Sequence, residues 1–333
     1  MSNARKLADN LPTDGQLGNR NIIVNGSCKI AQRGTSSTTT NGFGTVDRFR
    51  VYNGNVGTVT TNQYGGTTHA VDGVSNYSFR ATATNTASLV ANSDAHIRYV
   101  VEDKDIENIG ITNPNNNFTL SFHVKCSVAG QSSIGLTTGD FSTARYVVPY
   151  TIAAADTWQK VVITFPGHAS AYTPSNGFGL RIYWDLGVGT NYQTSTHNQW
   201  ITSGSHFAAA GNIQIIGVNG RWLQITGVQL EKGSQNTPFE HEPVGVTFSK
   251  CQRYFFGSSI RIHMNSANSD NWNNADVIFP TQMRATPTMT AGTNAGSCVL
   301  YATGVYTQNG QGLHIYSSTQ GGHYVEFTAD AEL

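Results

Sequence analysis

The chain has 333 residues, enough for two domains, of which only 12% are charged and 10% are aromatic. This aromatic content excludes a disordered chain, and 20 basic residues balanced by 20 acidic ones, without a basic run, give no electrostatic signature of nucleic-acid binding. No stretch approaches about 18 apolar residues, so we expect no membrane insertion. The N-terminus shows no secretory signal, so we expect the chain to be synthesised in a cytoplasm.

Residues 1–20 are predicted to be a separate N-terminal segment. Its first residues favour one or two helical turns that end at Leu11-Pro12. The segment is too short to bury a core. It is either a frayed tail or a peptide that docks onto another protein through Arg5, Lys6, Leu7 and Leu11.

From residue 21 the pattern is that of short strands separated by turn residues. In residues 118–125 the alternation is clear, with Phe118, Leu120, Phe122 and Val124 predicted to face inward. Such spacing, almost without helical periodicity, predicts a β-sandwich or jelly roll over residues 21–243. Strands are predicted at residues 22–24, 28–31, 47–52, 58–63, 78–83, 97–101, 118–125, 146–152, 158–165, 179–186, 213–218 and 222–230.

After residue 246 the pattern restarts, which predicts a smaller β domain over residues 244–333. It begins with a short helix at residues 248–253 and is either a small sandwich or a unit intertwined from three chains. No repeat of fixed period argues for a β-helix or propeller. The predicted fold class is therefore all-β, a jelly-roll β-sandwich followed by a smaller β domain. The six later strands are predicted at residues 254–264, 275–279, 286–291, 298–306, 313–317 and 324–329.

No pattern points to a catalytic or metal centre. The acidic run at residues 102–107 is typical of a solvated turn, although paired carboxylates also serve glycoside hydrolysis or Ca²⁺ binding. The ten histidines form no HExxH pattern, and there is no GxSxG. The four cysteines form no CxxC pair, which predicts buried hydrophobes rather than a zinc site. We therefore predict no enzymatic activity.

Aromatic residues in polar loops are the candidate ligand contacts. Sugar rings stack on aromatic planes, and Asn, Gln, Asp and Ser bind their hydroxyls. The loop at residues 187–205 has this composition throughout. The alternative is that such rings anchor a loop or a contact between subunits. The candidate glycan-binding residues are Tyr172, Tyr192, Trp200, Trp272 and Tyr306.

Five ordered stretches resemble motifs of phage tail-fibre and related virion proteins. Residues 21–34 resemble the "NLLxNGxxxxxQRG" opening, and Asp47-Arg48-Phe49 resembles the "DRW/DRF" strand. Residues 228–240 are similar to "xQLExGxxATPFE". Residues 251–255 match "CQRYY/F", and residues 279–288 are similar to "FPxxMRAxPT". The start of the chain, ARKLAD, also resembles the "ARDLAD" starts of such proteins in marine and cyanobacterial phages.

This resemblance implies a carbohydrate-binding-module-like jelly roll displayed on a virion, usually as a homotrimer, and implies that residues 1–20 dock onto another virion protein. The motif residues are expected to be structural: Asn25 and Gly26 make a turn, and Arg33, Asp47 and Arg48 form buried pairs. Similar jelly rolls often hold a structural Ca²⁺ near an acidic residue after the Asn-Gly pair. Ser27 and Cys28 stand there in this chain, so we expect no cofactor and find little support for the metal.

Three functions remain open from the sequence. The first is a tail fibre or other receptor-binding appendage that recognises a host-surface glycan without turnover. The second is a purely structural adaptor or capsid-attached fibre. The third is a depolymerase that cleaves host polysaccharide. The short N-terminal segment favours the first two, because it resembles a docking peptide.

Overall fold

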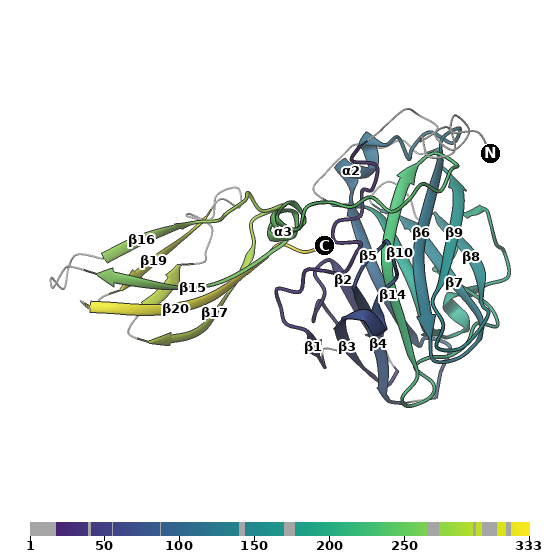
Figure 1. Cartoon of the computed structure of the whole chain (residues 1–333), viewed down its shortest axis with the longest axis horizontal. Coiled ribbons are helices and arrows are strands. Elements are labelled where there is room, and N and C mark those ends of the chain that lie inside the picture. The colour runs from purple at the N-terminus through teal and green to yellow at the C-terminus, as the bar shows by residue number, and fades with distance from the viewer. Residues whose placement is uncertain are drawn as a thin grey trace. The chain divides into compact units, whose positions relative to one another are not determined.

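The chain forms two compact units in the computed structural model (Figure 1). Unit 1 comprises Met1–Glu242 with Leu333, and unit 2 comprises Pro243–Glu332. Strands are the main secondary structure of both units and helices are few and short, so the prediction of an all-β chain is confirmed. The structure describes residues 18–38, 41–54, 56–86, 88–139, 144–169, 177–264, 273–295, 298–301, 312–317 and 321–333.

Unit 1 contains two six-stranded antiparallel sheets, each named here after one of its strands. The β14 sheet has the order β1 (Ser36–Ser37), β3 (Thr58–Gly65), β4 (Tyr77–Asn85), β14 (Trp222–Lys232), β6 (Asn117–Cys126), β9 (Gln159–Pro166). The β10 sheet has the order β12 (Trp200–Ile201), β8 (Arg145–Ile152), β7 (Gly130–Thr138), β10 (Phe178–Val188), β5 (Asp94–Glu102), β2 (Phe49–Gly54).

One core lies between the two sheets, because each strand turns alternate side chains inward. The four inward positions predicted for β6 are all fully buried, which confirms that alternation. Ring contacts join the sheets: Phe122 of β6 meets Trp184 of β10 at 5.7 Å, and Phe79 of β4 stacks on Phe49 of β2 at 5.8 Å. The sandwich is therefore held by aromatic packing across its middle.

The order of the strands is that of a jelly roll. The chain passes from β2 in the β10 sheet to β3 and β4 in the β14 sheet, and then returns to β5. It then crosses to β6 in the β14 sheet and returns to β7 and β8 in the β10 sheet. It crosses once more to β9 in the β14 sheet before it enters β10. β14, the last long strand of unit 1, pairs with β4 and β6, so it occupies an interior position of its sheet. This arrangement confirms the predicted jelly-roll sandwich.

β14 contains a β-bulge that its sequence pattern explains. Its inward residues follow alternation at Leu223 and Ile225, and resume at Val228 and Leu230 after one extra residue. The register against β6 shifts between Thr226 and Gln229. Gly227 lies at φ 61°, a left-handed conformation that glycine adopts without strain. The bulge therefore keeps both halves of the strand facing the core.

The motif residues near the start and end of unit 1 bind each other. The Asn21 backbone N–H donates to Glu240 at 2.8 Å, and the Asn21 side chain joins Val228 O and Leu230 N at 3.1 Å each. A methyl group at Gly26 would lie 2.0 Å from Val228 O, so this close approach requires glycine. The expected structural role of these motifs agrees with the contacts.

The Asp-Arg-Phe motif is buried, as expected from the resemblance. Asp47 accepts a hydrogen bond from the Gln32 N–H at 3.0 Å and lies 3.9 Å from the Arg33 guanidinium. Arg48 donates to Val100 O at 2.7 Å and lies over the Tyr99 ring. These contacts attach the chain before β2 to the end of the sandwich.

Several sequence predictions of local structure are wrong. The predicted strands 22–24, 28–31 and 213–218 are not strands, because their apolar side chains cover the ends of the sandwich while their backbones make only isolated hydrogen bonds. β7 was not predicted, because Ser, Gly and Thr dominate it. The acidic run contributes a short helix, α2 (Asp103–Asn108), in place of a solvated turn, and it packs against β5 and β10.

Unit 2 begins with α3 (Val244–Gln252), and its described residues then form six strands, the number predicted for this part of the chain. Its buried core includes Phe279, Met283 and Phe327. Arg284 of the "MRA" motif donates to Ala331 O at 2.8 Å, which ties the motif to the end of the unit. One sheet has the order β15 (Phe255–Met264), β20 (Gly321–Asp330), β17 (Thr288–Ala295), and the other β16 (Asn273–Ile278), β19 (Gly312–Ser317), β18 (Cys298–Tyr301).

Two further predictions concern virion docking and membrane insertion. Arg5, Lys6, Leu7 and Leu11 lie outside the described residues, so their docking role stays a prediction. Among the helices that the structure describes, none is both long and apolar enough to cross a membrane.

Candidate functional site

The outer face of the β10 sheet carries half-buried arginines beside aromatic side chains. Along β10, Leu180, Ile182 and Trp184 point into the core and are fully buried. The alternate residues, Arg181 and Tyr183, therefore point away from the core. The same alternation on the neighbouring strands brings further polar and aromatic residues to this face.

Four arginines lie on this outer face, one from each of four strands, and all are half-buried. The register places Arg50 of β2 directly opposite Arg98 of β5, and Arg98 directly opposite Tyr183. In the next row, Thr137 of β7 lies between Arg181 and Arg145 of β8. We call Arg50, Arg98, Arg145 and Arg181 the arginine cluster.

The arginine cluster is electrostatically costly. Like charges placed opposite each other on neighbouring strands destabilise a sheet. Burial, together with the positive charges of Arg50 and Arg181, lowers the pKa of Arg98 to about 10. Burial, with Arg181 nearby, also lowers the pKa of Arg145. The fold therefore concentrates positive charge here although the chain as a whole is neutral.

Few groups in unit 1 offset these charges. Across the described ranges, no carboxylate lies within salt-bridge distance of Arg98, Arg145 or Arg181. The Nε atoms of Arg98 and Arg181 are buried and have no hydrogen-bond acceptor there. Arg181 lies over the Phe178 ring at 3.4 Å, and Arg50 donates to Asn41 Oδ1 at 2.8 Å. Arg145 donates one hydrogen bond, to Ala144 O at 3.3 Å. Because a guanidinium carries five N–H donors, Arg98, Arg145 and Arg181 can still donate to an anion.

An aromatic cluster borders the arginines. Tyr183 stacks on Phe207 at 4.8 Å, and the His96 ring meets both of them edge-on, at 4.8 and 5.1 Å. His96 is also hydrogen-bonded to Asp94 at 2.7 Å. Burial lowers the pKa of His96, so its ring is neutral near pH 7. These rings form a rigid, mostly apolar border beside the cluster.

The loop after β10 fixes this border in place. Asn212 donates to Asp185 Oδ2 at 2.6 Å and to Ser133 Oγ at 2.7 Å. A methyl group at Gly135 would lie 2.1 Å from Phe207 O, so the loop backbone rests directly on β7. Burial raises the pKa of Asp185 to about 6. The loop is thus held against β7 and β10 by polar anchors.

The structure places two of the predicted glycan-binding residues, and they lie in separate ring clusters. Trp200 donates its indole N–H to Pro166 O at 2.9 Å and packs against Tyr146 and Phe165 on the core side of the sheet. Tyr192 packs against Phe207 at 5.3 Å. Tyr172, Trp272 and Tyr306 lie outside the described residues. All five stay untested as glycan contacts.

The arginine cluster was not among the functional residues predicted from the sequence. The available signal was an arginine at an outward position of several predicted strands, as in Phe49-Arg50-Val51 and Leu180-Arg181-Ile182. Which strands are neighbours, and in which register, follows only from the fold. The members are 36 to 48 positions apart in sequence, so no local pattern reveals the cluster.

The acidic and histidine side chains were also considered as metal ligands. Within the ranges that the structure describes, His, Cys, Asp and Glu form no group of three or more suited to a metal ion. Asp103 and Ile106 of α2 are fully buried, so this helix is anchored in the sandwich.

Solved structures similar to this chain include phage tailspike and baseplate proteins and carbohydrate-binding modules. A putative sugar binding protein from Bacteroides thetaiotaomicron covers 64% of this chain and 99% of its own, with 12% identity and a TM-score of 0.35. The enzymatically active domain of a bacteriophage CBA120 tailspike protein covers 64% of this chain, with 14% identity and a TM-score of 0.34, and this match spans 21% of its own chain. The baseplate tripod of bacteriophage Tuc2009 covers 68% of this chain and 59% of its own, with 12% identity and a TM-score of 0.27. No protein-family model and no curated protein matches the chain.

Proposed function

We propose that this chain is a bacteriophage virion appendage, a tail fibre or receptor-binding protein, that binds a host-surface glycan without cleaving it. The virion assignment is supported by the five tail-fibre-like motifs. The observation that carries glycan binding is the outer face of the β10 sheet, where a half-buried arginine cluster adjoins a fixed aromatic cluster.

This face has the chemistry that a sugar polymer requires. Each guanidinium presents five N–H donors in a rigid plane, which suits hydroxyl, ring and acidic oxygens of a sugar. The Tyr183, His96 and Phe207 rings provide an apolar border next to them. The core does not require these charges, because the inward residues of the same strands are fully buried without them.

The proposal includes a homotrimer whose N-terminal segments dock onto another virion protein. Binding at each site can then be weak, because several linked sites raise the overall affinity by their effective concentration. Residues 1–20 supply the docking peptide in this proposal, with Arg5, Lys6, Leu7 and Leu11 as contacts.

A polysaccharide array that includes neutral and acidic bacterial glycans tests the function with the purified full chain. We expect binding to a subset of the glycans, and no release of reducing ends from the glycans that bind. Release of reducing ends would show a depolymerase instead. Absence of binding to every glycan would contradict the proposal and favour the structural adaptor.

A further inference from the structure

We propose that the glycan is anionic, and that Arg98, Arg145 and Arg181 bind its carboxylate or sulfate groups on the outer face of the β10 sheet. This inference rests on the proposed function and names the substrate class of the same site. A carboxylate or sulfate accepts two parallel hydrogen bonds from one guanidinium, which is the strongest pairing that arginine makes with an oxygen ligand.

The positions of the arginines suit an extended polymer. Arg98 and Arg181 come from adjacent strands, and Arg145 comes from the second strand beyond Arg181. Neighbouring strands are about 4.8 Å apart, so the Cα atoms of Arg181 and Arg145 are about 10 Å apart across Thr137. A polysaccharide that crosses the strands meets the three guanidinium groups in succession. Several acidic groups of one chain can therefore bind together.

The surroundings of the arginines favour charge recognition over general hydrogen bonding. Half-burial removes part of the water around each guanidinium, and an ion pair is stronger where water is partly excluded. The repulsion between Arg98 and Arg50, which face each other, is relieved when an anion binds between the strands. A neutral sugar does not relieve it. Charge complementarity therefore selects an acidic glycan.

A nucleic acid fits this site less well. Proteins that follow a phosphate backbone present an extended basic surface, and this chain has equal numbers of basic and acidic residues. The arginine cluster is local and is bordered by a loop, because Arg98 lies opposite Tyr183 and Tyr183 stacks on Phe207 of that loop. We therefore commit to a polysaccharide and use DNA as a control.

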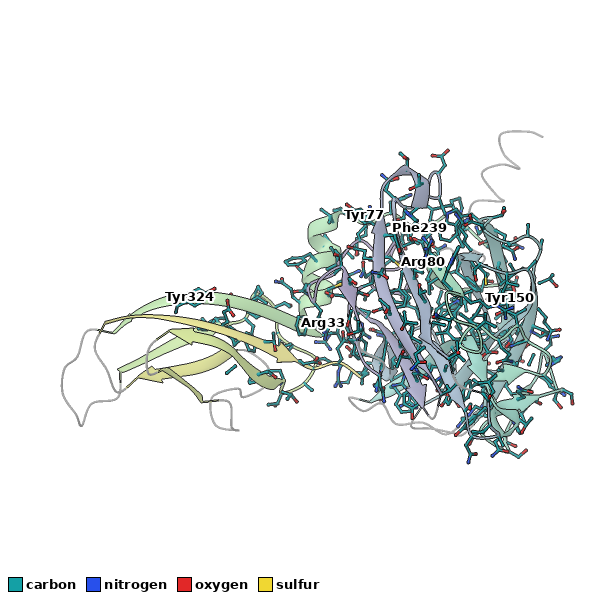
Figure 2. The ribbon with its side chains drawn as sticks, turned by 90° about the horizontal axis from the view of Figure 1, so that it is seen from below. Arg33, Tyr77, Arg80, Tyr150, Phe239 and Tyr324 are labelled. Atoms are coloured by element: carbon teal, nitrogen blue, oxygen red, sulfur yellow. The ribbon has the colours of Figure 1, made fainter. Side chains whose placement is uncertain are left out.

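Arg80, labelled in Figure 2, is a suitable control residue because it has an outward position on β4 of the opposite sheet and its guanidinium already has partners. Its guanidinium donates twice to Gln224 Oε1, at 2.9 and 2.7 Å. It also stacks on Tyr64 at 4.3 Å and on Trp222 at 3.9 Å. Replacing Arg80 with glutamine removes the same charge as the test substitutions, but on the other sheet, where Gln224 and two aromatic rings already engage the guanidinium.

The first measurement compares matched polymers that differ in charge. Binding of the full chain is measured by calorimetry to polygalacturonate and its methyl ester, to dextran sulfate and dextran, and to duplex DNA. We expect binding to one acidic polymer at least tenfold tighter than to its neutral partner, with an affinity that falls as salt increases. The two pairs separate a preference for carboxylate from one for sulfate.

The second measurement assigns the binding to these residues. Arg98→Gln and Arg181→Gln are each expected to weaken binding to the acidic polymer by about tenfold or more, since each removes a charge-assisted pair. Arg181→Lys is expected to recover part of the loss, because it keeps the charge but not the planar fork. Arg80→Gln should stay within about twofold of the parent. Melting temperatures confirm that all variants are folded.

Each contrary outcome identifies which proposal fails. Binding only to neutral polymers, on the array or by calorimetry, would overturn the anionic glycan and leave the proposed function standing. Binding to DNA as tight as to the acidic polymer would overturn the anionic glycan in favour of a site that binds any anion. Loss of binding in Arg80→Gln but not in the Arg98 and Arg181 variants would place the site on the β14 sheet. No binding to any glycan would overturn both proposals.

Discussion

Replacing Trp184 with alanine is expected to lower the free energy of unfolding of the chain by about 3–5 kcal/mol. Trp184 is the largest fully buried side chain of unit 1 and contacts Phe122 of the other sheet at 5.7 Å and Phe49 at 6.2 Å. Alanine would leave a cavity between two sheets whose backbones are fixed by antiparallel pairing, so they can close it only in part.

Urea unfolding of the full chain, followed by far-UV circular dichroism, measures this loss. Trp184→Phe is the matched control. It keeps most of the ring contacts and removes an indole N–H that has no hydrogen-bond partner among the described residues. We therefore expect Trp184→Phe to cost much less than Trp184→Ala. Equal stability of Trp184→Ala and the parent would contradict the assignment of this residue to the centre of the core.

Glu231→Ala is the second substitution with a large expected effect. Glu231 is buried and accepts hydrogen bonds from the Thr237 N–H at 3.0 Å, the Thr237 hydroxyl at 2.6 Å and the Gln229 amide at 3.1 Å. Its removal leaves the Thr237 N–H without an acceptor, and leaves the Gln229 amide and the Thr237 hydroxyl with only longer contacts, of 3.2–3.5 Å, to Thr237 and Pro238. The orphaned N–H costs about 1–3 kcal/mol, and the loss of two further hydrogen bonds to the carboxyl group adds to it, so we expect a total loss of about 3 kcal/mol or more.

The same urea experiment measures this effect, with Glu107→Ala as control. Glu107 is exposed on α2, and a surface substitution of this kind stays within about 0.5 kcal/mol of the parent. A loss below about 1 kcal/mol in Glu231→Ala would show that the network around Gln229 and Thr237 does not hold the end of unit 1 together.

The sequence alone predicted the general architecture because alternation reports which face of a strand is buried. Residues 118–125 follow this rule throughout, residues 222–230 follow it on either side of the bulge, and both are strands. The rule fails where apolar residues cover the ends of the sandwich, as in residues 213–218, whose buried Ile215 and Ile216 make no ladder. It also fails for β7, because small polar residues on a buried strand resemble a loop.

The candidate site was harder to predict for a physical reason. The predicted ligand contacts are rings in polar loops, and two of them, Trp200 and Tyr192, pack against other rings in the structure. The arginine cluster depends on strand order and register. A shift of one residue in β5 or β10 would turn Arg98 or Arg181 into the core, so only the assembled sheet brings these charges together.

The most direct test of the account is arginine protection by a bound glycan. The full chain is modified with phenylglyoxal in the presence and in the absence of polygalacturonate or dextran sulfate. Mass spectrometry then quantifies the modification of each arginine. The account predicts that the acidic polymer that binds slows the modification of Arg98, Arg145 and Arg181 and leaves Arg80 unchanged. Protection of Arg80 with no protection of the other three would contradict the assignment of the glycan site to the outer face of the β10 sheet.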